Sequence, residues 1–131
     1  MNVVDSSGWL EYFADGSNAV HFCAVIENTT ELIVPVISIF EVFKRVLQQR
    51  TEGEALKAIA LMQQGHVVEL DVPLSLSAAK LSCELKLPMA DSIILATARA
   101  NMAELWTQDA DFSGVKGVRY FPKNHGAHRA P

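Results

Sequence analysis

Short runs that favour strands alternate with longer helical patterns along this chain of 131 residues, and this alternation constrains its fold more than any other feature. The strand runs are rich in Val, Ile and Leu, whereas apolar residues recur every three or four positions in the stretches between them. Such alternation is typical of βαβ units, in which helices cover a mostly parallel sheet. The sequence therefore predicts an α/β fold.

Several boundaries of these elements follow from residues that stop or start a helix. Gly65 is a natural stop for one helix, and Pro73 suits the first turn of the next. The predicted strands cover residues 2–4, 32–36, 67–70, 105–107 and 118–121. The predicted helices cover residues 8–14, 17–27, 38–49, 52–64, 73–85 and 90–101.

The chain is long enough, and apolar enough at half of its residues, to form one hydrophobic core. We therefore expect a single domain over residues 1–131. The longest apolar stretch, residues 32–40, is interrupted by Pro35 and Ser38 and is far shorter than the roughly 20 residues of a membrane-spanning helix. The N-terminus lacks the basic region and the long apolar run of a secretory signal. We therefore expect no membrane segment and a cytoplasmic location.

The cysteines and histidines do not suggest a metal or redox site. Cys23 and Cys83 are far apart, with no Cys-x-x-Cys pair and no histidine at zinc-ligand spacing around them. Buried thiols are therefore expected rather than a disulfide. The histidines are isolated or lie near the C-terminus, and we assign none of them a catalytic role.

The formal charge of −4 argues against binding to a nucleic-acid backbone, which normally depends on Lys and Arg. The charge is unevenly distributed, however. After Asp111 the chain contains four basic residues and no acid, so residues 1–111 carry 7 basic and 15 acidic groups, a balance of −8. Residues 122–131 would form a basic tail. Divalent cations bound to some of the acids would invert the local field, so that an acidic site could accept a phosphodiester.

Four acids follow predicted strands, where ligands bind in open α/β sheets. Asp5 follows the first strand, and its other possible role, as N-cap of the next helix, is compatible with ligand binding. Glu41 follows the second strand, although the residues alone favour an ordinary helix-surface pair with Arg45. Asp109 and Asp111 follow the strand at 105–107, and ordinary turn chemistry is the alternative for both.

A fifth acid, Asp91, begins the strongest helical pattern of the sequence. It shares a face with the apolar residues Ile94, Leu95, Ala98 and Met102. An inward-facing carboxylate is costly unless it is paired, and a cation is one candidate partner. The alternative is an acid in the first turn that interacts with the helix dipole and caps the helix with its own side chain.

Four segments taken together resemble the pattern of the PIN-domain ribonucleases. That pattern has an Asp after the first strand, a Glu opening the helix after the second, an Asp opening a late helix and an Asp after the fourth strand. The matching segments are NVVDSS (2–7), PVISIFEV (35–42), PMADSIILATA (88–98) and LWTQDADF (105–112). The resemblance covers nearly the whole chain except residues 123–131. It implies a three-layer α/β/α PIN-like domain with a mostly parallel central sheet of four to five strands.

The resemblance also implies a catalytic site that hydrolyses RNA to 5′-phosphate and 3′-hydroxyl ends. The acids that match the family's catalytic metal ligands are Asp5, Glu41, Asp91 and Asp109. Asp111 is a further candidate ligand, and Ser6 and Thr107 resemble hydroxyls that orient the carboxylates or a metal-bound water. One or two Mg²⁺ or Mn²⁺ ions are the implied cofactors, and oxygen ligands suit these hard cations.

The small size of the domain is similar to that of VapC toxins, which implies an RNA substrate, a small antitoxin partner and a homodimer. Candidate RNA contacts are Lys44, Arg45, Lys116 and Arg119, although surface solubility explains them equally well. One alternative is a PIN nuclease that processes RNA without an antitoxin, and another is a non-catalytic PIN-like binding module. A receiver-like signalling domain fits less well, because Asp5 has no acidic neighbour and Thr107 is followed by Gln108 rather than by lysine.

Overall fold

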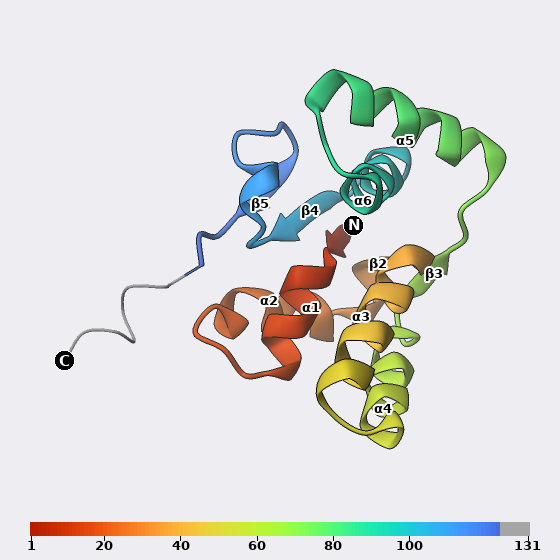
Figure 1. The fold of residues 1–131 in the computed structure, drawn as a ribbon. Helices are drawn as coiled ribbons and strands as arrows, with labels where there is room; N and C mark the ends of the chain where they lie inside the picture. Colours follow the sequence, from red (N-terminus) through yellow and green to blue (C-terminus); the bar gives the residue numbers. More distant parts are fainter. Residues whose placement is uncertain (124–131) are drawn as a thin grey trace.

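The computed structural model describes residues 1–123, and its centre is a five-stranded sheet with strand order β3-β2-β1-β4-β5 (Figure 1). The strands are β1 (Asn2–Val4), β2 (Leu32–Pro35), β3 (His66–Val68), β4 (Glu104–Thr107) and β5 (Val118–Tyr120). Within residues 1–123, every pair of neighbouring strands is parallel. The prediction of an α/β fold around a parallel sheet is therefore confirmed.

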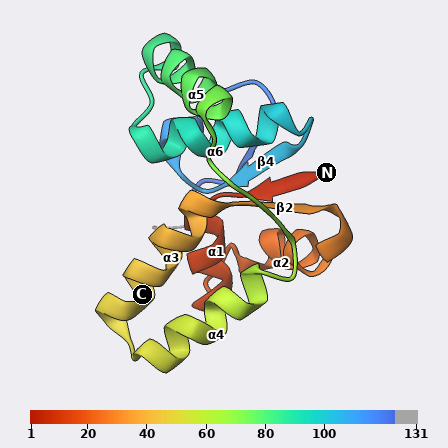
Figure 2. The ribbon, with the colours of Figure 1, turned by 90° about the vertical axis from the view of Figure 1, so that its right-hand side faces the viewer.

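Helices cover both faces of the sheet. They are α1 (Ser6–Phe13), α2 (Ala19–Glu27), α3 (Val36–Gln49), α4 (Glu52–Met62), α5 (Val72–Leu85) and α6 (Met89–Ala100), with short 3-10 turns η1 (Thr29–Glu31) and η2 (Ala110–Phe112). Figure 2 shows α5 and α6 on one side of the sheet and α1 to α4 on the other, which confirms the predicted three layers. None of the helices in residues 1–123 is both long and apolar enough to span a membrane.

Successive side chains of the central strands point to opposite layers, because the side-chain repeat of a strand is two residues. Val4 of β1 packs in a buried cluster with Trp9 of α1 and Phe22 of α2. Its neighbour Val3 packs on the other face in a cluster that contains Ile94 of α6. The central strands are thus buried on both sides, as is usual in parallel sheets.

The position of β1 explains where the site forms. β1 lies in the middle of the sheet, with β2 on one side and β4 on the other. Where the strand order switches in this way, the segments that follow the two neighbouring strands run to opposite faces of the sheet. They leave a crevice between them at the carboxyl ends of the strands. Asp5 follows β1 at this edge and Gln108 follows β4. α3 begins directly after β2, so its first turns also reach the crevice.

Two helices on the site side begin earlier than predicted. α1 begins at Ser6 because the side chain of Asp5 caps it, accepting a hydrogen bond from the backbone N–H of Gly8. α3 begins at Val36, immediately after Pro35, whose extended backbone ends β2. Both shifts bring the following side chains closer to the end of the preceding strand.

Three side chains that we expected to be buried are not in the core. Cys23 and Cys83 are free thiols, but Cys23 is only partly buried and Cys83 is exposed. Cys23 lies on the outer side of α2, where its thiol donates to Glu27 Oε2 at 3.1 Å. Met102 is 92% exposed, because α6 ends at Ala100 and Met102 lies in the turn that follows it.

The C-terminal residues are described only in part. Of the basic tail predicted for residues 122–131, the structure describes Pro122 and Lys123, and residues 124–131 lie outside the described part. A single domain over residues 1–131 therefore stays a prediction, and so does the tail.

Candidate active site

Asp5 lies at the carboxyl end of β1 and is almost completely buried, with 2% of its surface exposed. Its Oδ1 accepts hydrogen bonds from Ser7 Oγ at 2.7 Å and from the Gly8 backbone at 3.2 Å. Burial raises the pKa of Asp5 to about 6, and the two hydrogen bonds oppose this rise. Asp5 is therefore the N-cap of α1 and, at the same time, a buried carboxyl whose charged form a nearby cation would favour.

Glu41 is held by the neighbouring helix rather than by its own. Its Oε1 accepts a hydrogen bond from Ser6 Oγ at 2.5 Å. Since Ser6 begins α1 and Glu41 belongs to α3, this bond joins the helices that follow β1 and β2. The alternative pairing of Glu41 with Arg45 is not among the ion pairs of residues 1–123.

Asp91 lies in the first turn of α6 and is partly buried. The N-cap of this helix is Pro88, and no side chain caps it, so Asp91 does not have the capping role of the alternative interpretation. The pKa of Asp91 is raised to about 7, first by burial and then by the negative charges of the other four acids. Without a cation, Asp91 is thus in an unfavourable electrostatic position.

The segment after β4 shapes the remaining part of the site. Thr107 is fully buried, and its Oγ1 accepts a hydrogen bond from the backbone N–H of Asp109 at 2.9 Å. Asp109 in turn accepts one from the backbone N–H of Asp111 at 2.9 Å and caps the turn η2. The expected turn chemistry is present, and it holds both acids beside the N-terminus of α6.

Three of the acids are close enough to share an ion. Asp91, Asp109 and Asp111 each offer a carboxylate oxygen, and these oxygens all lie within 4.8 Å of one another. Asp5 and Glu41 lie outside this tight group, although their charges act on Asp91. A set of carboxylates that repel one another fits a hard divalent cation such as Mg²⁺ or Mn²⁺, which takes oxygen ligands. Asp111, the weakest candidate in the sequence, belongs to the tightest cluster.

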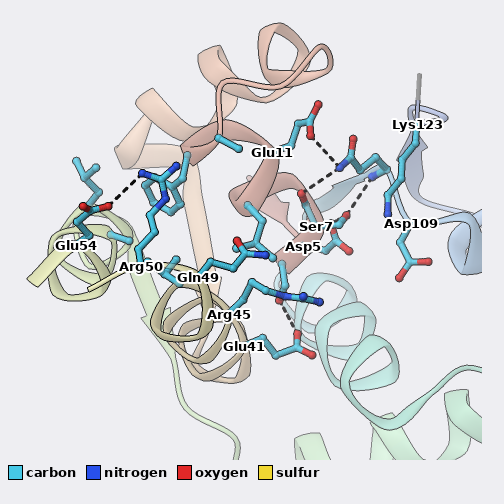
Figure 3. A pocket seen from close by; sticks show the side chains of 18 of the residues that line it. Asp5, Ser7, Glu11, Glu41, Arg45, Gln49, Arg50, Glu54, Asp109 and Lys123 are labelled. Carbon is cyan, nitrogen blue, oxygen red and sulfur yellow. Dashed lines mark hydrogen bonds and ion pairs between the residues drawn. The ribbon is translucent and has the colours of Figure 1, made fainter. Parts of the chain in front are cut away.

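A cavity of about 710 Å³ opens beside these acids (Figure 3). It is lined by Asp5, Glu41, Asp91 and Asp109, which come from four segments that are distant in the sequence. From the acids it extends along α1, α3 and α4, where its wall contains Arg45, Arg50 and Lys57. The cavity is thus acidic at one end and basic along its length.

A comparison with models of protein families identifies the family of this chain. The model of the PIN domain matches residues 3–118, a stretch that includes all five acids. This chain belongs to the PIN domain family. A comparison with curated proteins finds no match.

Solved structures share the fold of this PIN domain. A toxin–antitoxin complex from Klebsiella pneumoniae matches with a TM-score of 0.77 and 22% identity, covering 93% of this chain and 99% of that chain. DNA-bound VapBC from Salmonella typhimurium matches with a TM-score of 0.71 and 14% identity, covering 93% and 98%. The sarcin-ricin loop cleaving toxin VapC20 from Mycobacterium tuberculosis has a TM-score of 0.71 and 15% identity, covering 88% and 95%. At these identities the likeness concerns the fold.

The four basic residues suggested as RNA contacts occupy different places in this PIN domain. Arg45 lines the cavity beside the acids. The Lys44 ammonium instead lies 5.9 Å from the centre of the Phe40 ring, on another side of α3. Arg119 pairs with Glu104, and Lys116 does not line the cavity. The structure therefore brings one of the four to the site.

Several residues at the site of this PIN domain were not found from the sequence. Ser7 hydrogen-bonds to Asp5, and its Oγ lies 3.5 Å from Thr107 Oγ1. Gln108 and Lys123 also line the cavity. The pairing of Ser7 with Asp5 could have been suspected from the sequence, since a Ser two residues after an N-cap lies near it. No local signal indicated the other two.

Proposed function

We propose that this PIN domain is a metal-dependent endoribonuclease that hydrolyses RNA phosphodiester bonds and acts as the toxin of a toxin–antitoxin pair. The observation that carries the proposal is the cluster of Asp91, Asp109 and Asp111, whose carboxylate oxygens lie within 4.8 Å of one another beside the buried Asp5. Membership of the PIN family supports a nuclease in general. The finer assignment to Mg²⁺ or Mn²⁺ is our inference from this cluster, and the assignment to RNA rests on the resemblance to PIN-domain ribonucleases.

The residues that would hold one or two ions are Asp91, Asp109 and Asp111, together with Asp5 and Glu41, which lie outside this group but line the same cavity. Such an ion supplies an activated water and neutralises the charge that develops on the phosphate. The raised pKa of Asp91 means that this carboxyl releases a proton when a positive charge approaches. Binding of the cation should therefore be stronger at higher pH.

The surrounding hydroxyls keep the acids in place. Ser6 holds Glu41, Ser7 holds Asp5, and Thr107 fixes the backbone of Asp109. Hydroxyls that hold ligands in this way contribute to metal affinity and activity, although they touch neither the ion nor the substrate. The basic wall of the cavity, where Arg45 lies beside Glu41, would contact the phosphates of the RNA next to the bond that is cut.

The toxin assignment is supported by the similar solved structures, which include VapBC complexes and a toxin–antitoxin complex. The partner would be a small antitoxin that inserts a basic or blocking segment into the acidic end of the cavity. Association into a homodimer is proposed from family resemblance alone. Growth arrest on expression, relieved by co-expression of a small DNA-binding protein encoded next to this chain, would distinguish a toxin from a housekeeping RNA-processing nuclease.

The decisive test of the chemistry is incubation of the purified protein with total RNA, with Mg²⁺, with Mn²⁺ and with EDTA. We expect cleavage with either cation, none in EDTA, and a loss of roughly 100-fold or more in Asp91→Asn. Glu84→Gln is the matched control, because Glu84 is exposed on α5 and does not line the cavity. This variant should cleave RNA like wild type. Cleavage that persists in EDTA or in Asp91→Asn would remove the proposed mechanism, and no cleavage under any condition would favour a non-catalytic module.

A further inference from the structure

A buried amide side chain fastens the segment after β5 beside the acids. The Asn18 amide uses both of its N–H donors, one to the Pro122 carbonyl and one to Gln108 Oε1, each at 3.0 Å. Asn18 is 6% exposed and Gln108 is 7% exposed, so the bond between them is shielded from water, whereas the bond to the Pro122 carbonyl is only partly buried. They join the loop before α2, the turn before Asp109 and the end of the described chain, which are far apart in the sequence.

Phe121 anchors the same segment from the other side. Its backbone N–H donates to the Thr107 carbonyl at 2.8 Å, which extends the pairing of β5 with β4 by one residue. Its ring stacks on Trp106 at 5.9 Å and on His21 at 4.4 Å between ring centres, and it meets Phe22 edge to face. The backbone two residues before Lys123 is therefore fixed against β4 and α2.

This anchoring places Lys123 at the edge of the cavity, next to Asp109. Lys123 lines the cavity, and Figure 3 shows its side chain extending toward Asp109. Lys116 and Arg119, the other basic residues after Asp111 within residues 1–123, do not line it. Arg119 is held by Glu104, whereas Lys123 takes part in none of the ion pairs of the described residues. Among residues 1–123, therefore, no ion pair occupies its ammonium.

We propose that Lys123 binds a phosphate of the RNA on the β5 side of the acids, and that Asn18 is the positioning residue that holds Lys123 there. The inference rests on the proposed ribonuclease function. Arg45 extends from α3 into the same cavity, and in Figure 3 Asp5 lies between the side chains of Arg45 and Lys123. A strand that crosses the acids meets a positive charge on each side. Because an ammonium binds phosphate as a point charge, this contact carries no base specificity.

The test measures binding separately from cleavage. In the Asp91→Asn background, fluorescence anisotropy gives the Kd for a labelled single-stranded RNA oligonucleotide at a series of KCl concentrations. We expect Lys123→Ala to weaken binding about ten-fold. The slope of log Kd against log salt should fall by about 0.7, the value for one phosphate contact to a single strand. Lys123→Arg should restore most of the affinity. Lys80→Ala, an exposed lysine of α5, is the matched control and should bind as the background does.

The role of Asn18 is tested by coupling. Asn18→Ala should weaken binding by a similar factor alone but add little to Lys123→Ala, because both act through the same contact. If the Asn18→Ala protein does not fold, Asn18→Ser replaces it in the same measurement. Additive effects would overturn the positioning role of Asn18.

The proposed contact between Lys123 and phosphate is wrong if Lys123→Ala binds RNA as tightly as Lys80→Ala. It is also wrong if Lys123→Ala and Lys80→Ala weaken binding equally. The proposed function fails in a different way. If RNA binding depends on Lys123 but the wild-type protein never cleaves RNA with Mg²⁺ or Mn²⁺, the proposed ribonuclease activity is wrong. The proposed contact between Lys123 and phosphate would still hold.

Discussion

The carboxylate oxygens of Asp91 and Asp109 lie within 4.8 Å of each other, although one residue belongs to the first turn of α6 and the other to the turn after β4. The charge of Asp109 is the largest electrostatic cause of the raised pKa of Asp91, after burial. Two negative charges at this separation repel each other strongly at reduced dielectric. The protein therefore carries a local electrostatic cost that a bound cation would remove.

Divalent cations should stabilise the fold. At about 100 times the Kd, Mg²⁺ or Mn²⁺ is expected to raise the Tm of wild type by roughly 5–10 °C, since only the folded state presents the clustered acids. Asp109→Asn should respond much less, and Glu84→Gln should respond like wild type. Thermal unfolding with and without cation measures the difference. Equal responses in all three proteins would contradict a cation site at these acids.

Without cations, the protein should lose stability as pH rises. The pKa values of Asp5 and Asp91 are raised to about 6 and about 7, above the ordinary aspartate value of 3.8. Between pH values of about 4 and 7 the folded state thus holds protons that the unfolded state has released, so the free energy of unfolding falls across this window. In EDTA, the Tm of wild type should fall more between about pH 5 and about pH 8 than that of Asp91→Asn. Parallel curves for the two proteins would show that Asp91 does not titrate in this way.

Ser6 should matter for activity through Glu41. Ser6→Ala removes the hydroxyl that donates to Glu41 Oε1 at 2.5 Å, so Glu41 loses its orientation. We expect cleavage to fall about ten-fold or more, with little change in Tm, and Ser6→Thr to recover part of the loss. Ser77→Ala on the exposed side of α5 is the control. A Ser6→Ala protein with unchanged kcat and unchanged cation affinity would mean that the bond has no functional role.

Two glycines in helices should respond oppositely to substitution by alanine. A Cβ on Gly8 would lie 2.6 Å from Val4 Cγ1 and 3.0 Å from the Phe22 ring, so Gly8→Ala should destabilise the fold by about 1–3 kcal/mol and displace α1 from the site. A Cβ on Gly53 meets nothing closer than 3.9 Å, and Gly53→Ala should stabilise by up to about 1 kcal/mol. Urea unfolding of both variants measures the two free energies. A Gly8→Ala protein as stable as wild type would show that α1 can move without cost.

The sequence alone determined the architecture and the edge of the sheet where the site forms. Short β-favouring runs and longer helical repeats are local patterns, so the alternation of strands and helices could be predicted without long-range information. The positions of Asp5, Glu41 and Asp109 after strands followed from the same pattern, because parallel strands place their carboxyl ends at one edge. Local pattern, however, could not decide how far each side chain is buried.

Only the tertiary structure decided which side chains meet. The turn η2 brings Asp111 into the tight cluster with Asp91 and Asp109, whereas Asp5 lies outside this cluster as the buried cap of α1. Likewise, the stacking of Phe121 and the bonds of Asn18 bring Lys123 to the cavity, while Arg119, equally basic in the sequence, is held by Glu104. The physical reason is that repeat patterns fix the face of an element, but distances between charges depend on strand order, turn geometry and packing between distant segments.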